Sequence, residues 1–254
     1  MHKINEQGGY QMKKILSYYL CLCMLLGLSG CRTKKNDDDI LKFFDAIDTT
    51  LQAKSASIDG NITIQNGKND SQMNVKGEFN QENQLQCAIH LGLEANKNVI
   101  DDYLDFYIKD GKTYLKNMST KSQSLASKIG IKENTKISAY NPFLDLTDKE
   151  LCEMFTASKR HGDTYTFTLD PSQLAELLDN LGSVNLSEAT VKTTFKDKVI
   201  SMISIEAKGQ ESISKKSQDI AFHITLNIHD YHALKKVTYP DDLDSYPTSN
   251  EEQA

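Results

Sequence analysis

The sequence contains little that points to catalysis or to a disulfide framework. It has five cysteines in 254 residues. It lacks the Gly-x-Ser-x-Gly elbow of serine hydrolases, a glycine-rich phosphate loop, and a Ser-x-x-Lys motif in a recognisable penicillin-binding context. The sequence therefore predicts a protein that is not an enzyme, with no catalytic residues and no cofactor.

Basic residues are also fewer than acidic ones, 29 against 35. The formal net charge is −6, and Lys3, Lys13 and Lys14 outnumber Glu6 in the first thirty residues, so the rest of the chain is more acidic still. Such a chain is a poor candidate for binding nucleic acid or anionic lipid surfaces by charge. Because the acidic and basic residues are interspersed, their main effect is solubility.

The chain has a single long apolar run, residues 15–28, which follows Lys13 and Lys14. This run is shorter than the roughly 20 residues that span a bilayer, and its order of basic start, apolar core and small residues is typical of a secretory signal peptide. The run ends in Leu28-Ser29-Gly30-Cys31, which resembles the lipobox of bacterial lipoproteins. The resemblance implies a diacylglyceryl group on Cys31 and cleavage just before it.

These features predict a signal peptide over residues 1–30 and a lipidated tether over residues 31–39. Two acyl chains anchor a protein stably, so we expect an extracytoplasmic protein held on the outer face of the cell membrane. Residues 7–9 (QGG) can be encoded by a purine-rich sequence like a bacterial ribosome-binding site, so translation is expected to start at Met12.

Hydrophobic periodicity changes along the remaining chain. Apolar residues at spacings of three and four predict a helix over residues 40–53. Alternation then predicts strands at residues 58–64, 73–79, 85–93, 100–108 and 113–117. These strands read as successive hairpins of an antiparallel meander with one apolar face.

The second half repeats this plan without a residue-level repeat. A short helix is expected before Gly130, and residues 147–150 form a capping box ahead of apolar residues 151, 154 and 155. A strand at 165–169, a helix at 171–181 and strands at 191–195, 199–207, 220–228 and 233–238 follow. The acidic, proline-containing tail, residues 239–254, is expected to be extended and partly loose.

The sequence therefore predicts an α+β fold in a single domain, residues 40–238. About ten amphipathic strands in one antiparallel sheet would curve strongly, because twist accumulates, and the helices would cover the concave apolar face. This plan, together with residues 107–114 (YIKDGKTY) and 237–240 (VTYP), resembles Gram-positive members of the LolA/LppX-like half-barrel lipoproteins. Members of that wider group carry lipids or lipoprotein acyl chains in the concave cavity.

Large apolar side chains on the predicted strands are the candidate site. They would either fill the core or line a cavity between sheet and helices for a hydrophobic ligand. The candidate cavity residues are Phe79, Leu91, Phe106, Phe167, Phe222 and Ile224. We expect this face to point at the helices of residues 40–53 and 171–181, because a one-residue register slip would put every one of these side chains into water.

The leading hypothesis is a membrane-anchored carrier or sensor of a lipid-like ligand. The alternative is an envelope interaction or assembly lipoprotein with a filled core and no small-molecule ligand. A solute-binding lipoprotein of a transporter is disfavoured, because the βαβ alternation expected for that class is missing.

Cysteine, histidine and aspartate residues offer weaker candidates. A Cys87–Cys152 disulfide is possible in this compartment, but the sequence cannot show whether the two residues meet. His223, His229 and His232 are interpreted as surface residues rather than metal ligands, since zinc sites need three or four converging ligands. The acidic run of residues 37–39 lacks the glycine and distal glutamate of a calcium loop. No metal site is therefore predicted.

Overall fold

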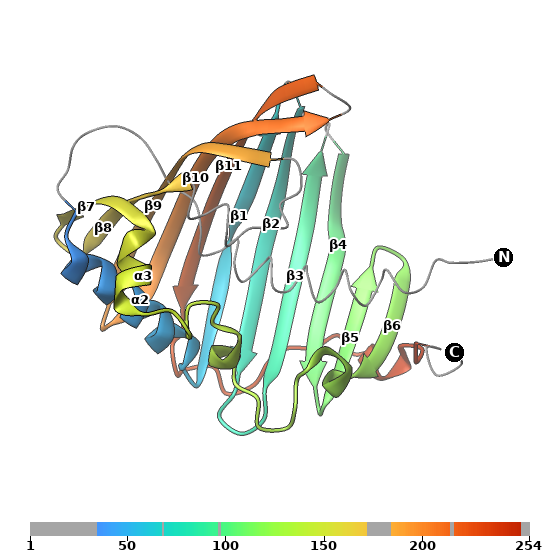
Figure 1. Ribbon diagram of the computed structural model, residues 1–254. Helices are drawn as coiled ribbons and strands as arrows, with labels where there is room; N and C mark the ends of the chain where they lie inside the picture. The colour runs from blue at the N-terminus through green and yellow to red at the C-terminus, as the bar shows by residue number, and fades with distance from the viewer. Residues whose placement is uncertain (1–34, 68, 96–97, 172–183, 214–215, 250–254) are drawn as a thin grey trace.

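Eleven antiparallel strands form one open sheet that curves around the helices α2 (Asp37–Leu51) and α3 (Asp148–Glu153) (Figure 1). The computed structural model describes residues 35–67, 69–95, 98–171, 184–213 and 216–249. The strand order is β6-β5-β4-β3-β2-β1-β11-β10-β9-β8-β7. The predicted half-barrel is confirmed.

The sheet consists of two up-and-down meanders that meet where β1 pairs with β11. The first meander comprises β1 (Ser55–Asn66), β2 (Asn69–Asn80), β3 (Gln86–Ala95), β4 (Asn98–Lys109), β5 (Lys112–Asn117) and β6 (Thr120–Leu125). The second meander comprises β7 (Phe155–His161), β8 (Thr164–Leu169), β9 (Val184–Lys196), β10 (Val199–Ile213) and β11 (Lys216–His229). The seam between the meanders therefore joins the first strand to the last.

The long helix α2 forms because its apolar residues recur on one face and its start is capped. The Asn36 side chain accepts a hydrogen bond from the backbone N–H of Asp38, and the acidic residues 37–39 lie in the first turn, where the helix dipole favours negative charge. The helix therefore begins at Asp37, within the segment predicted as a tether. Its buried face carries Ile40, Phe43 and Ile47.

Several predicted boundaries move in the structure. The capping box at Thr147 and Glu150 is present, but α3 ends at Glu153 and Phe155 already begins β7. Residues 120–125, for which no strand is predicted, form β6, while the predicted strand at 233–238 is wrong. The predicted helix at 171–181 lies almost wholly outside the described residues.

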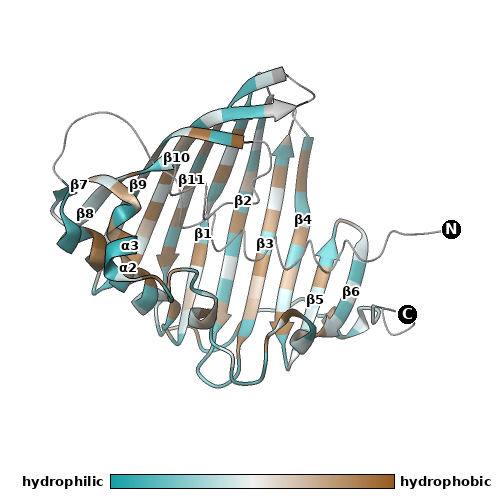
Figure 2. Ribbon diagram, in the orientation of Figure 1, coloured by the Kyte–Doolittle hydropathy of each residue, from teal (hydrophilic) through white to brown (hydrophobic). Residues whose placement is uncertain are grey.

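Apolar and polar residues alternate along many of the strands (Figure 2), and the two larger buried clusters lie on the concave face. The main buried cluster combines α2 and α3 with β1, β2, β3 and β7 to β11. A second cluster lies at the lower end of β3 to β5, beneath the 3₁₀ helix η1 (Ala126–Ile129) and Ile131. Among the described residues, none of the helices combines the length and apolar character needed to span a membrane.

The chain after β11 crosses the convex face instead of forming a loose tail. Leu243 and Tyr246, at the 3₁₀ helix η3 (Leu243–Ser245), are buried against Tyr107 and Tyr114. Beyond them, the backbone of Gln123 in β6 hydrogen-bonds to Pro247 and Ser249. The tail prediction is therefore wrong for residues 239–249. These contacts cover part of β6, an edge strand that would otherwise expose unpaired backbone groups.

Candidate ligand-binding face

The six predicted cavity residues share one face of the sheet. Residues paired across neighbouring strands point to the same side, and side chains alternate along each strand. Phe222 pairs with Ile64, and Leu91 pairs with Val75, so the registers of consecutive strands place the six on one continuous surface. That surface is Phe79, Leu91, Phe106, Phe167, Phe222 and Ile224. It is the concave side, because α2 packs in the same cluster as Phe167 and Ile224.

The structure distributes these six residues between two clusters. Leu91, Phe167 and Ile224 belong to the main cluster and are buried there. Phe106 lies in the second cluster with Phe79 packed against it, whereas Phe222 is half-buried at the margin of the main cluster. Phe79 and Phe106 therefore pack beneath the η1 segment rather than against α2, which the period-two pattern could not distinguish.

Beneath α2, the concave face of the second meander is filled by aromatic rings. The ring centroid of Phe43 lies 5.0 Å from that of Phe167 and 6.4 Å from that of Phe195. Tyr165 stacks on Phe195 with the two centroids 4.5 Å apart. Phe167 has 0% of its surface exposed. Such packing stabilises the fold and accounts for these aromatics as core residues.

The concave face of the first meander is covered differently. The helix α2 packs mainly on β10 and β7, and within the described residues no α-helix has its main contacts on β1 to β4 (Figure 1). Apolar side chains at the seam and on these strands stay half-buried. We call the following set the apolar strip: Ile58, Ile64, Ile89, Leu93, Leu104 and Phe222. This strip leaves apolar surface on the concave face that a ligand could cover.

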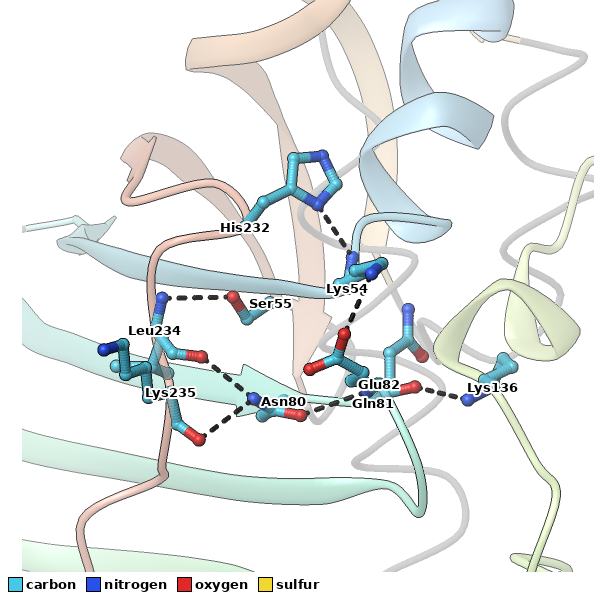
Figure 3. Close-up of polar contacts among 9 residues, drawn as sticks. All are labelled: Lys54, Ser55, Asn80, Gln81, Glu82, Lys136, His232, Leu234 and Lys235. Carbon is cyan, nitrogen blue, oxygen red and sulfur yellow. Dashed lines mark hydrogen bonds and ion pairs between the residues drawn. The ribbon is translucent and has the colours of Figure 1, made fainter.

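The lower end of the strip is closed by the segment that carries the 3₁₀ helix η2 (Ile137–Tyr140). Gln81, 3% exposed, donates from its side-chain amide to the carbonyls of Leu51 and Ala53, and its amide oxygen accepts from the backbone N–H of Ile137 at 2.8 Å. Lys136 donates to the Gln81 carbonyl (Figure 3). Gln81 thus ties the end of α2 and the β2–β3 loop to the η2 segment.

A polar pocket of about 410 Å³ opens at the same end of the molecule. Its lining includes Lys54, Glu82 and His232, in the region drawn in Figure 3. The Lys54 ammonium lies 2.8 Å from the Glu82 carboxylate, and this hydrogen bond raises the pKa of Lys54 and lowers that of Glu82. Paired charges of both signs on an open surface do not favour an acyl chain, so this pocket is distinct from the apolar strip.

His223 and His229 lie on the convex face and pair with carboxylates, whereas His232, in the turn after β11, accepts a hydrogen bond from the backbone N–H of Lys54. His229 Nε2 lies 2.9 Å from Asp59 and its Nδ1 lies 2.6 Å from Asp230. These two hydrogen bonds, that of Asp230 first, raise the pKa of His229. In the described part of the chain, no three His, Cys, Asp or Glu side chains converge on a point where a metal could bind.

The possible Cys87–Cys152 disulfide is not formed. Both thiols are free and buried, Cys87 in the second cluster and Cys152 in the main cluster. Burial raises the pKa of Cys87 to about 12, so this thiol is protonated and a poor nucleophile at neutral pH. The two cysteines act as small apolar core residues.

Two residues that the sequence does not single out belong to this site. Gln81 sits in a polar loop, and Tyr140 follows a segment without clear periodicity. Tyr140 packs against the second cluster, and its buried hydroxyl has no hydrogen-bond partner. No local sequence pattern predicts the role of either side chain. The residues that Gln81 hydrogen-bonds and the cluster that Tyr140 packs against are mostly far away in the sequence.

Comparisons with known proteins return structures but no sequence relatives. No protein-family model matches the chain, and no curated protein matches it. The fold is similar to that of LprF from Mycobacterium bovis, at 10% identity and a TM-score of 0.39, covering 82% of this chain and 99% of that one. A putative outer membrane lipoprotein-sorting protein domain from Vibrio parahaemolyticus has 9% identity and a TM-score of 0.31, covering 83% and 98%.

A LolA superfamily protein from Nitrosomonas europaea is also similar, at 10% identity and a TM-score of 0.28, covering 81% of this chain and 96% of that one. It is named for the group that the sequence resembles. These identities and TM-scores are too low to transfer a function.

Proposed function

We propose that this chain is an extracytoplasmic, non-enzymatic lipoprotein that binds a lipid-like ligand on the concave face of its first meander. The observation that carries the proposal is the apolar strip, whose side chains remain half-buried where no described α-helix has its main contacts. Binding sites for apolar ligands are lined mainly by apolar and aromatic side chains. A bound acyl chain would remove this surface from water.

The strip has suitable dimensions. From Ile58 to Ile64 on β1 the backbone advances six residues, or about 20 Å at roughly 3.3 Å per residue. A single acyl chain occupies about half of the roughly 30 Å hydrocarbon core of a bilayer. One extended chain therefore fits along the strand direction.

The proposed anchor would set the orientation on the membrane. The backbone N–H of Asn36, at the start of α2, donates to the Ser158 hydroxyl of β7 at 2.8 Å. Asn36 lies five positions after Cys31, and an extended chain advances at most about 3.6 Å per position, so the two residues are at most roughly 18 Å apart. A lipid on Cys31 would thus keep the β7 edge close to the membrane.

Native mass spectrometry of the purified, lipid-anchored protein tests the ligand. The native mass should exceed the denatured mass by that of a lipid, because denaturation releases a non-covalent ligand but retains the covalent anchor. Equal masses across preparations from membranes, and no uptake from added lipid, would contradict the binding proposal.

The anchor has a separate test. The Cys31→Ala variant should lose labelling by a radioactive fatty acid and leave the membrane fraction or remain as precursor. Labelling and membrane retention of the alanine variant would overturn the anchor.

A second candidate is an envelope interaction or assembly lipoprotein with no small-molecule ligand. The aromatic packing beneath α2 favours it, since Phe43, Phe167 and Tyr165 are buried there as core residues. This candidate predicts identical native and denatured masses. The mass comparison therefore separates the two functions.

A further inference from the structure

Tyr140 carries an unusual hydroxyl group. In the described part of the chain, three buried side-chain polar atoms have no hydrogen-bond partner: Asn66 Oδ1, Tyr140 Oη and Ser249 Oγ. Of these three residues, Tyr140 alone packs against one of the two concave clusters. Buried tyrosine hydroxyls usually find a partner, so an unpartnered one needs an explanation.

The surroundings of Tyr140 are apolar. The buried residues of the second cluster are Leu85, Cys87, Phe106, Ile108, Ala126 and Ile131. Burial raises the pKa of Tyr140, so its hydroxyl stays protonated and can donate a hydrogen bond at neutral pH. The site thus presents one hydrogen-bond donor within a hydrocarbon environment.

Tyr140 also lies at the end of the apolar strip. Ile89 and Leu104, two members of the strip, contact the second cluster as well as the main one. Ile137, one turn before Tyr140, does the same. Gln81 holds the start of this turn by accepting a hydrogen bond from the backbone N–H of Ile137.

We propose that Tyr140 Oη donates a hydrogen bond to the carbonyl oxygen of an acyl ester whose hydrocarbon chain lies along the apolar strip. The inference rests on the proposed function and narrows its ligand class from any apolar molecule to acyl esters. A site whose buried donor is paired only by the right ligand discriminates against the analogue that lacks the acceptor.

The test uses two probes of similar length, methyl palmitate and heptadecane, and the Tyr140→Phe variant of the full chain. Both probes compete for the protein against an environment-sensitive naphthalene fluorophore. The wild type should bind methyl palmitate about tenfold more tightly than the variant does, a difference of about 1.4 kcal/mol. Heptadecane should bind the two proteins equally.

A matched control is Tyr165→Phe, which removes a tyrosine hydroxyl from the main cluster on the same face. It should leave the affinity for both probes unchanged. Thermal unfolding provides the fold control, because deleting an unpaired buried hydroxyl should leave Tyr140→Phe at least as stable as the wild type.

The outcomes separate the two proposals. If both probes bind but Tyr140→Phe changes neither affinity, or changes both equally, the role of Tyr140 is wrong and the lipid-binding function stands. If neither probe competes and the fluorophore does not bind, the proposed function fails and the inference fails with it.

Discussion

The part of the concave face beneath α2 and the apolar strip begin with the same kind of sequence and end in different environments. Strands of both meanders alternate apolar and polar residues, yet Phe167 in the second meander is fully buried while Phe222 at the seam is half-buried. The difference arises from α2, which packs mainly on β10 and β7 and brings Phe43 against Phe167. An apolar strand face thus becomes core or candidate binding surface according to what packs on it.

The sharpest test of this comparison substitutes the same residue type beneath α2 and in the apolar strip. Phe167→Ala should destabilise the protein by about 3–5 kcal/mol, because a fully buried ring is deleted beneath α2. Phe222→Ala should cost roughly half as much and should reduce lipid retention, which Phe167→Ala should not do directly. Urea unfolding and native mass spectrometry measure the two effects. Equal stability losses would remove the distinction between the region beneath α2 and the apolar strip.

The seam between the halves can be disturbed at Gly60. An added Cβ there would lie 1.9 Å from the Thr225 carbonyl oxygen and 2.9 Å from Leu226 Cα, both backbone atoms of β11. Gly60→Ala should therefore destabilise the protein by about 1–3 kcal/mol, the usual range for overpacking.

Gly77→Ala is the control for this variant. An added Cβ at Gly77 first meets the side chain of Ile58, at 2.8 Å, which can move. A smaller loss of unfolding free energy is expected. A loss at Gly77 as large as that at Gly60 would contradict the seam argument.

The contact between the η2 segment and the lower end of the first meander depends on Gln81. Gln81→Leu leaves the carbonyls of Leu51 and Ala53 and the N–H of Ile137 without this partner, which should cost about 1–3 kcal/mol. Faster amide exchange is expected at residues 136–140, while α2 beneath its aromatic partners should exchange as in the wild type. Gln84→Leu in the same loop is the control, and an equal loss there would refute the role of Gln81.

The smallest effect concerns the link from β11 to β1 through His229 and Asp59. The pKa of His229 is raised in the folded state. Its contribution to the free energy of unfolding is therefore complete below the unfolded-state pKa of about 6.5 and is lost as the pH rises through the folded-state pKa. The ring is half-exposed, so the contribution should stay below about 1 kcal/mol.

As the pH rises from about 6.5 through the raised folded-state pKa of His229, the wild type should lose unfolding free energy that the His229→Gln variant does not lose. His223→Gln, on the same strand and face, is the control. A pH dependence unchanged in His229→Gln would show that this pair does not stabilise the seam.

Much of the fold was predictable because its signals are local. The alternation at residues 220–228 placed β11, and the capping box at Thr147 and Glu150 placed the start of α3. Errors occurred where distant residues decide. No local sequence pattern predicts that Tyr246 is buried against Tyr114 on the convex face. The sequence therefore predicts a loose tail.

The sequence by itself determined the antiparallel meanders, the single apolar face and the six side chains on it, since strand period and turn chemistry are properties of neighbouring residues. Only the tertiary structure decided which part of that face α2 fills, where the free thiols lie, that Gln81 joins α2 to η2 and that Tyr140 packs against the second cluster. These outcomes depend on the packing of segments far apart in the chain. Such packing is determined by how the side chains of distant segments fit together, and the local sequence pattern does not contain that information.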